Sequence, residues 1–192
     1  MDDIILIGGG GHCNSVIDVL ESEAKFKIVG ILDKSELIGT EISGYTVLGC
    51  DEDLPYLAKQ YKFALVTVGQ IRSPDLRIKL FEMAKQAGFI LPAVISPRAY
   101  LSRNTEVGSG SIIMHDVLLN ANVKIGNNCI INTKVLIEHD SEVGDNCHVS
   151  TRATVNGGVK IENNCFVGSG AITRENITIK GNCFVKAGSV IK

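Results

Sequence analysis

The feature that most constrains this chain is a six-residue period that runs through its second half without a slip. Branched aliphatic residues recur at every sixth position from residue 95 to residue 191, and Thr173 is the only exception. Four residues after each of them stands a mostly small residue, such as Ser111 or Cys129. A period of six fits neither a helix face nor a simple hairpin meander. It predicts a solenoid in which six residues form one short parallel strand and a corner.

Four asparagine–cysteine pairs indicate the size of one coil. Cys129, Cys147, Cys165 and Cys183 are 18 residues apart, and so are the asparagines that precede them. Three hexads therefore close one coil, and stacking of coils places these cysteines in a ladder with rungs about 4.8 Å apart. Zinc ligands occur in close pairs such as Cys-x2–4-Cys, and no such pair occurs here. We therefore expect the ladder to pack inside the solenoid as small hydrophobes, with no metal site.

The first part of the chain follows a different pattern, in which apolar strand-like segments alternate with segments of helical spacing. The strand-like segments are 3–7, 27–33 and 63–69, and the helical segments are 13–23 and 73–88. Such alternation is typical of a parallel α/β unit. We expect a small Rossmann-like parallel α/β domain over residues 1–92, followed by a parallel β-helix of hexapeptide repeats over residues 93–192.

A glycine run, 8-GGGGH-12, joins the first expected strand to the first expected helix. Backbone N–H groups and the helix dipole at such a junction bind phosphate. The dinucleotide fingerprint Gly-x-Gly-x-x-Gly is incomplete, because Cys13 stands where the third glycine would be. A tight turn that needs positive φ is the structural alternative. We expect anion or nucleotide binding, with His12 donating to a phosphate and Asp33 placed where such folds hold a ribose.

Polar residues that break the hexad repeat mark the corners where chemistry is expected. His139 lies in 137-IEHDSEVG-144, between Glu138 and Asp140. A neutral imidazole beside a carboxylate is a base poised near neutral pH, because the carboxylate stabilises its protonated form. His148 is at an outward position in the expected register, and His115 heads a column that continues with Thr133, Thr151, Ser169 and Ala187. A solvated corner is the alternative for each of these histidines, so the pattern makes His139 a candidate base and not yet a mechanism.

Composition excludes several classes of partner. The formal net charge is −2 and the pI is about 6.1, which leaves no basic field for nucleic acid or for an anionic membrane. The apolar run 4–7 is too short for a signal peptide or a membrane span. Six cysteines without a secretory signal indicate reduced thiols, and we therefore expect a cytoplasmic protein.

The hexad array resembles the left-handed β-helix acyltransferases that use acetyl-CoA, and the left hand is taken from that resemblance. The whole chain is similar to the bacterial nucleotide-amino-sugar acetyltransferase family, some of whose members carry the label sialic-acid O-acetyltransferase. The matching segments span the chain; they are 5-ILIGGGGH-12, 31-ILD-33, 66-VTVG-69, Asn132, 137-IEHD-140, 147-CHVS-150 and 165-CFVGSGA-171.

This resemblance implies a homotrimer with active sites between neighbouring β-helices. It implies that the first domain binds a nucleotide-linked sugar. Gly10, Gly11 and His12 would hold the diphosphate, and Asp33 and Gly69 would lie near the nucleotide or the sugar.

The resemblance also assigns roles in the β-helix, which would bind acetyl-CoA and carry out catalysis. His139 would be the general base, Asp140 would raise its basicity, and Asn132 would lie near the acceptor. The residues expected along the acetyl-CoA channel are His148, Ser169 and Ala187. No metal is expected.

The implied reaction is acetyl-CoA-dependent N-acetylation of the 4-amino group of a nucleotide-linked amino-deoxy sugar, for a surface polysaccharide or glycan. O-acetylation of sialic acid or a related nonulosonate is the alternative. A non-catalytic scaffold and a Rossmann-type NAD enzyme are two further classes. Lys34 and Gln70 replace residues found in the bacillosamine-pathway member, so the nucleotide (UDP, GDP or dTDP) and the sugar stereochemistry stay open.

Overall fold

The computed structural model describes all 192 residues. The chain divides into two compact units. The first comprises residues 1–69 and 75–92, and the second comprises residues 70–74 and 93–192. The passage into the solenoid thus falls between Pro92 and Ala93, but the short segment 70–74, which we expected in the first domain, belongs to the second unit.

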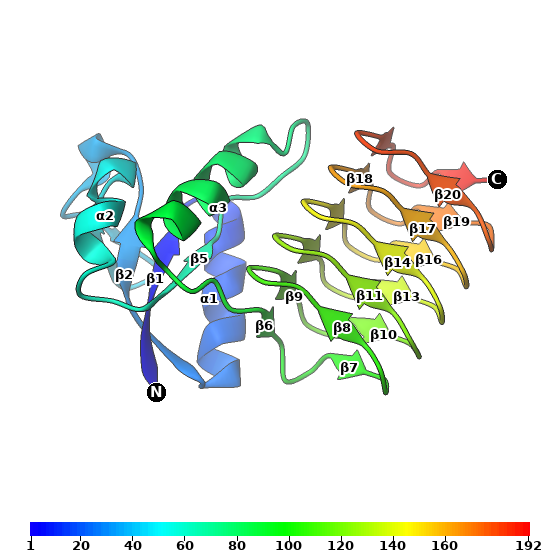
Figure 1. The fold of residues 1–192 in the computed structure, drawn as a ribbon, viewed down its shortest axis with the longest axis horizontal. Coiled ribbons are helices and arrows are strands. Elements are labelled where there is room, and N and C mark those ends of the chain that lie inside the picture. Colours follow the sequence, from blue (N-terminus) through cyan, green and yellow to red (C-terminus); the bar gives the residue numbers. More distant parts are fainter. The chain divides into compact units, whose positions relative to one another are not determined.

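The first unit is a five-stranded sheet with helices (Figure 1). Its strand order is β3-β4-β2-β1-β5, and β3 pairs antiparallel with β4 while the other pairs are parallel. The strands are β1 (Asp2–Ile7), β2 (Phe26–Leu32), β3 (Glu41–Ile42), β4 (Tyr45–Gly49) and β5 (Phe63–Val66). The helices are α1 (Gly11–Glu23), α2 (Leu54–Leu57) and α3 (Asp75–Ala87), with 3-10 turns at Ser35–Leu37 and Asp51–Asp53.

The central strand β1 explains why this unit folds as an α/β sheet. Residues 4–7 are all fully buried, as expected for a parallel strand covered on both faces. Arg77, on α3, is 1% exposed, and its Nη1 donates to the carbonyl oxygens of Val66 (2.7 Å) and Val68 (2.9 Å). A buried guanidinium therefore binds backbone carbonyls at the carboxyl end of β5, where the strand ends three residues earlier than the sequence indicated.

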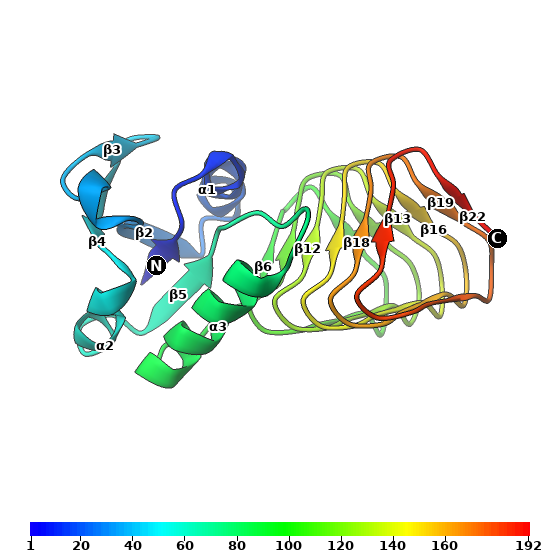
Figure 2. The same cartoon turned by 90° about the horizontal axis from the view of Figure 1, so that it is seen from above.

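The second unit is a left-handed parallel β-helix, as the resemblance implied (Figure 2). Its first strand, β6, spans Val94–Ile95, and each later strand is two residues long and begins six residues after the one before, up to β22 at Val190–Ile191. These strands form three parallel sheets. Sheet I contains β6, β9, β12, β15, β18 and β21; sheet II contains β7, β10, β13, β16, β19 and β22; sheet III contains β8, β11, β14, β17 and β20.

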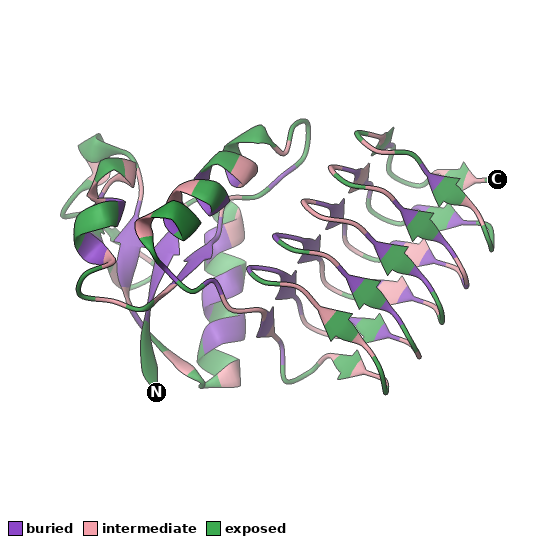
Figure 3. Ribbon diagram, in the orientation of Figure 1, coloured by how far each residue is buried: buried purple, intermediate pink, exposed green.

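The aliphatic column fills the interior of the β-helix. From Ile113 to Val185 its members are at most 8% exposed, and each such side chain stabilises the fold by about 1.5–3 kcal/mol when fully buried. Thr173, the exception, is 1% exposed. Its Oγ1 accepts from the Asn156 backbone N–H at 2.9 Å, so the hydroxyl is satisfied inside the prism. Figure 3 shows the contrast with sheet III, where the outward residue of each strand is exposed.

The asparagine that precedes each ladder cysteine has a conformational role. Backbone φ is positive at every sixth residue from Asn104 to Gly188, for example 55° at Asn128. Asn, Asp and Gly tolerate this left-handed conformation best, which explains why they recur at the corners. The cysteines are free thiols, and three of them are fully buried while Cys183, in the last coil, is partly exposed.

The ladder cysteines also bind the backbone of the next coil. The Cys129 Sγ donates to the Gly144 carbonyl oxygen at 3.0 Å, and the Cys147 Sγ donates to the Glu162 carbonyl oxygen at 3.2 Å. These contacts confirm the expectation that the ladder is scaffolding.

Candidate active site

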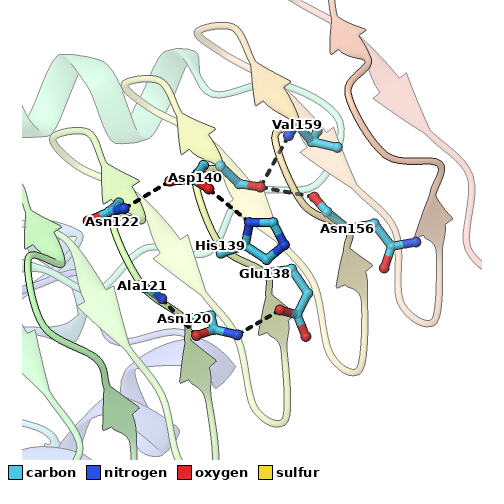
Figure 4. A network of polar contacts seen from close by, with 9 residues as sticks. Asn120, Ala121, Asn122, Glu138, His139, Asp140, Asn156 and Val159 are labelled. Carbon is cyan, nitrogen blue, oxygen red and sulfur yellow. Dashed lines mark hydrogen bonds and ion pairs between the residues drawn. The ribbon is translucent and has the colours of Figure 1, made fainter.

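His139 lies at a corner of the β-helix, between strand β13 (Leu136–Ile137) and strand β14 (Glu142–Val143). Its Nδ1 lies 2.8 Å from Asp140 Oδ2, and its side chain is 60% exposed. Figure 4 shows the ring turned toward that carboxylate. The geometry places the proton on Nδ1, which donates to Asp140, and leaves the Nε2 lone pair free of hydrogen bonds within the chain.

Asp140 is held in place from two sides. Its backbone has φ of 59° and donates to the Ala121 carbonyl oxygen at 2.9 Å. Its other carboxylate oxygen accepts from Asn122 Nδ2 at 2.9 Å. The hydrogen bond from Asn122 and then the contact with His139 lower the pKa of the Asp140 carboxyl below its ordinary value. This favours the ionised carboxylate, the form that accepts the Nδ1 proton of His139.

Small residues stand above and below His139 on the neighbouring coils. Ala121 precedes it in the column and Gly157 follows it. A Cβ at Gly157 would lie 2.9 Å from both His139 Cε1 and His139 Nε2. The absence of a side chain at residue 157 therefore makes the space in which the ring lies.

Glu138 is not a partner of the imidazole. Its Oε2 accepts from Asn120 Nδ2 at 2.7 Å, and the Asn120 side-chain oxygen accepts from the Ala121 backbone N–H at 2.8 Å. Figure 4 shows this pair on the side of the corner away from Asp140. Of the two acids that flank His139, only Asp140 orients it.

The surroundings of His148 differ from those of His139. It lies on β15 (His148–Val149), pairs in register with Ile130 and Phe166 as the hexad pattern predicts, and is only 7% exposed. Its Nδ1 donates to the Gln70 carbonyl oxygen, and its Nε2 accepts from Asn132 Nδ2 at 3.2 Å. The structure thus brings Asn132 and His148 together and places the Gln70 backbone against the ring.

The segment 70–74 is fixed to the β-helix by a second contact. Gln70 is 3% exposed, and its Nε2 donates to the Asn146 carbonyl oxygen at 2.9 Å. The sequence marked Gln70 only as a departure from a relative. Its structural role was not visible because it depends on a contact across 76 residues of chain.

Ser169 and Ala187 lie on adjacent coils at the corner between sheet I and sheet II. Both are exposed. The Gly188 backbone N–H donates to the Ser169 carbonyl oxygen at 2.9 Å, and Ser169 Oγ lies 2.9 Å from Ser150 Oγ. His139 lies at the corner between sheet II and sheet III. The structure therefore groups Ser169 with Ala187 but puts them at a different corner from the candidate base.

The corner that carries Ser169 also contains His115. Its Nδ1 lies 2.6 Å from Ser96 Oγ, which itself accepts from the Arg98 backbone N–H at 3.0 Å. Ser96 Oγ and the imidazole are thus within hydrogen-bond distance, and the tautomer of the ring decides which of them donates.

In the first unit, the expected nucleotide-binding residues lie around the start of α1. Gly10 is the N-cap residue of this 13-residue helix, no side chain caps it, and its first turn has no acidic residue. A Cβ on Gly10 or Gly11 would have open space around it. The positive end of the helix dipole is thus accessible to an anion.

Asp33 and Gly69 lie against this glycine loop. The Asp33 carboxylate accepts from the backbone N–H groups of Gly9 and Lys34, so one of its tasks is to fix the loop. A Cβ on Gly69 would lie 3.5 Å from the His12 Cβ. The structure thus brings the five expected residues of this unit together. Only Gly8 of the glycine run has positive φ, 101°, so a tight turn does not account for the others.

Comparison with protein families matches both units. The PglD N-terminal domain matches residues 3–84. Bacterial transferase hexapeptide repeats match residues 98–139 and 122–157, and the hexapeptide repeat of succinyl-transferase matches residues 158–192. A comparison with curated protein sequences finds no match.

Solved structures extend the similarity over the whole chain. A perosamine N-acetyltransferase from Caulobacter crescentus, in complex with CoA and GDP-perosamine, is 32% identical, with a TM-score of 0.91 over 100% of this chain and 89% of that chain. The acetyltransferase domain of PglB from Neisseria gonorrhoeae FA1090 is 27% identical, with a TM-score of 0.92 over 100% of this chain and 92% of that chain. This chain belongs to the nucleotide-amino-sugar acetyltransferase family.

Membership confirms the expected family, the fold and an enzymatic activity, sugar acetyl transfer. It does not fit a non-catalytic scaffold or a Rossmann-type NAD enzyme. No group of three or more His, Cys, Asp or Glu side chains could hold a metal ion. None of the helices is long and apolar enough to cross a bilayer.

Within this acetyltransferase, the roles of three residues near His139 were not predicted from the sequence. They are Asn120, Asn122 and Gly157. The 18-residue spacing could have identified them, because Asn120 and Asn122 precede Glu138 and Asp140 by one coil, and Gly157 follows His139 by one coil.

Proposed function

We propose that this acetyltransferase transfers the acetyl group of acetyl-CoA to the 4-amino group of a nucleotide-linked amino-deoxy sugar, with His139 as general base. The observation that carries the proposal is the corner at residues 139–140. There Asp140 orients the imidazole through Nδ1, and Nε2 faces an exposed space. Solved relatives bound to CoA and a nucleotide-linked sugar support the substrate classes.

The geometry suits direct transfer without an acyl-enzyme. An amine must be neutral to attack the thioester carbonyl, and His139 Nε2 takes the amine proton as the C–N bond forms. The resulting imidazolium is stabilised by the Asp140 carboxylate at 2.8 Å. When the C–S bond breaks, Nε2 returns the proton to the departing sulfur. Backbone N–H groups along the coil are the natural donors for the oxyanion.

A histidine is also the residue altered in two solved relatives. Forms of the Caulobacter crescentus enzyme in which a histidine is replaced by asparagine or alanine hold both CoA and GDP-perosamine. Binding of CoA and the sugar nucleotide without that histidine is what a general base predicts, because it is needed for proton transfer and not for binding.

The start of α1 is the proposed site for the diphosphate of the nucleotide sugar. Gly10 and Gly11 leave room for a phosphate to approach the backbone N–H groups, and His12 lies beside them. Asp33 and Gly69 border the same loop and are proposed to contact the nucleotide or sugar. Asn132 is proposed to lie near the acceptor, and His148, Ser169 and Ala187 along the acetyl-CoA channel.

We also propose a homotrimer, in which corners of different copies complete each site. The outward column of sheet II is apolar except for Thr154, whereas the outward column of sheet III consists of paired charges and Thr178. In sheet II, Tyr100 is 62% exposed, Ile172 44% and Val190 65%. In sheet III, Lys124 pairs with Glu106 at 3.7 Å and Lys160 with Glu142 at 3.5 Å. An exposed apolar stripe is the expected sign of a covering partner.

The first experiment follows free thiol released from acetyl-CoA against a panel of acceptors. The panel contains UDP-, GDP- and dTDP-linked 4-amino-6-deoxy sugars, together with sialic acid and its CMP form. Rapid turnover with one amino sugar supports the proposal and identifies the nucleotide. Turnover with sialic acid alone would move the acceptor to a hydroxyl, and silence with every acceptor would contradict the proposal.

The oligomeric state is tested by light scattering on the eluting protein. The proposed trimer has three times the 20.6 kDa chain mass. Ile172→Glu, in the apolar column, is expected to dissociate it, whereas Thr178→Glu, in the charged face, is not. A monomeric wild-type enzyme with full activity would contradict the proposed assembly.

A further inference from the structure

Two cations occupy positions where this β-helix otherwise uses Asn, Asp or Gly. These are Lys134 and Arg152, with φ of 61° and 59°. Every other corner residue with positive φ in the six-residue series from Asn104 to Gly188 is an asparagine, an aspartate or a glycine. Long side chains disfavour this conformation, so both residues contradict the local preference of the fold.

The two cations also lie at the same corner on adjacent coils. The Lys134 backbone N–H donates to the His115 carbonyl oxygen at 3.0 Å, and the Arg152 backbone N–H donates to the Thr133 carbonyl oxygen at 3.1 Å. Equivalent residues of adjacent coils are about 4.8 Å apart in the stacking direction, and like charges directly opposite each other are destabilising. The pair therefore lowers stability both through conformation and through repulsion.

No acidic side chain forms an ion pair with either cation. The carboxylate one coil before Lys134 belongs to Asp116, and Arg98 binds both of its oxygens, at 2.8 and 2.9 Å. Lys134 and Arg152 are exposed and form no ion pair in the chain. One coil after Arg152 the same position is Gly170, whose missing Cβ would have open space. The corner thus presents two uncompensated positive charges beside an open surface.

Hydroxyl groups accompany the two cations. The residue before each is a threonine, Thr133 or Thr151, and the next member of that column is Ser169, one of the residues proposed for the acetyl-CoA channel. Lysine, arginine and hydroxyl side chains together are the usual donors to phosphate. Residues that break a local rule without structural compensation are expected at functional sites.

We propose that Lys134 and Arg152 bind a phosphate or diphosphate group of a phosphorylated substrate of this enzyme. This inference rests on the proposed function, which supplies two sources of that chemistry. One source is the phosphates of acetyl-CoA and the other is the diphosphate of the nucleotide sugar. The arginine can bind two phosphate oxygens through its planar fork, and the lysine adds a point charge.

The test is the double variant Lys134→Asn/Arg152→Asn. Asparagine is the residue used at most other corners, so the variant is expected to melt at the wild-type temperature or above it. Two affinities are measured: the Kd of CoA by isothermal titration calorimetry, and the KM of the amino-sugar nucleotide identified in the acceptor panel. Lys160→Gln is the matched control, because it removes an exposed positive charge from sheet III.

We expect one of the two affinities to weaken about tenfold or more through loss of charge-assisted hydrogen bonds, with kcat nearly unchanged and the control unaffected. Weaker CoA binding assigns the cations to the acetyl donor, and a raised KM for the sugar assigns them to the nucleotide diphosphate. If both affinities stay at wild-type values in a stable variant, the inference is wrong and the proposed function is untouched. A wild-type protein that neither binds CoA nor releases thiol contradicts the proposed function and this inference with it.

Discussion

His139 and His148 lie on the same β-helix, yet their surroundings prepare them for different tasks. His139 stands at an exposed corner, with one nitrogen bound to Asp140 and the other free of hydrogen bonds in the chain. His148 lies on a strand, 7% exposed, with the Gln70 carbonyl on one nitrogen and the Asn132 amide on the other. Its ring also packs edge-on against Phe166, with the centroids 5.2 Å apart.

The difference bears on the proposal that His139 is the general base. Proton transfer needs an available lone pair and a carboxylate that stabilises the protonated ring. Of these two histidines, only His139 has one nitrogen without a hydrogen bond in the chain and a carboxylate at the other nitrogen. His148 joins β15 to the segment 70–74, and protonation at Nε2 would set a positive charge against the amide hydrogens of Asn132.

Replacing His139 with alanine should remove the base and leave the fold intact. We expect kcat to fall at least about 100-fold, the lower range for loss of a general base. CoA binding and the melting temperature should be unchanged, because the side chain is 60% exposed. Steady-state kinetics, calorimetry with CoA and thermal melting check these three points. Full activity in this variant would falsify the assignment of His139.

Replacing Asp140 with asparagine should weaken the base without removing it. We expect a roughly tenfold or larger loss of kcat, because the carboxylate orients the imidazole and stabilises its protonated form. Glu138→Gln is the control, because Glu138 contacts Asn120 and not the ring. Equal effects in the two variants would contradict the assigned role of Asp140.

Replacing Gly157 with alanine should displace the imidazole. The added Cβ would come within 2.9 Å of the ring, and the ring must turn away from its bound position. We expect kcat to fall about tenfold, since small displacements of a reacting group are costly, with little change in melting temperature. Ala121→Gly, on the opposite side of His139, adds no atom and is expected to leave kcat nearly unchanged. An unaffected kcat in Gly157→Ala would show that the ring has room to spare.

Replacing His148 with alanine should lower stability more than it lowers the rate of proton transfer. The variant leaves the Gln70 carbonyl and the Asn132 amide without their partner and opens space beside Phe166. We expect a loss of about 2 kcal/mol, which lowers the melting temperature by several degrees. The measurement compares the melting temperature of this variant with that of His139→Ala. A large fall in kcat at an unchanged melting temperature in His148→Ala would contradict the structural role assigned to His148.

The hexad pattern was sufficient to predict the β-helix, its strand register and the buried cysteine ladder. This was possible because each coil repeats the same local problem: one aliphatic and one small residue must point inward on every side. In the first unit, the alternation of strand-like and helical segments predicted fewer of the elements. It predicted β1, β2, β5 and the two long helices. It did not predict β3, β4 or α2, which are short and lack a strong apolar period.

The candidate base could also be identified from the sequence, because His139 and Asp140 are adjacent and their interaction is local. The supporting residues could not, since Asn122 and Gly157 act from neighbouring coils. Their roles cannot be recognised in the sequence, because each looks like an ordinary member of its column in the repeat. The same holds for Lys134 and Arg152, whose departure becomes visible once φ at the corners is known.

The sequence alone thus determined the solenoid, the α/β unit before it and the identity of a histidine–carboxylate pair, because all three depend on periodicity or on adjacent residues. The tertiary structure alone decided which nitrogen of each histidine is engaged, that Gln70 belongs with the β-helix, and that two cations face an open corner without acidic partners. Those facts depend on contacts between residues one coil or more apart. Such contacts are determined by distance and direction in space and not by spacing along the chain.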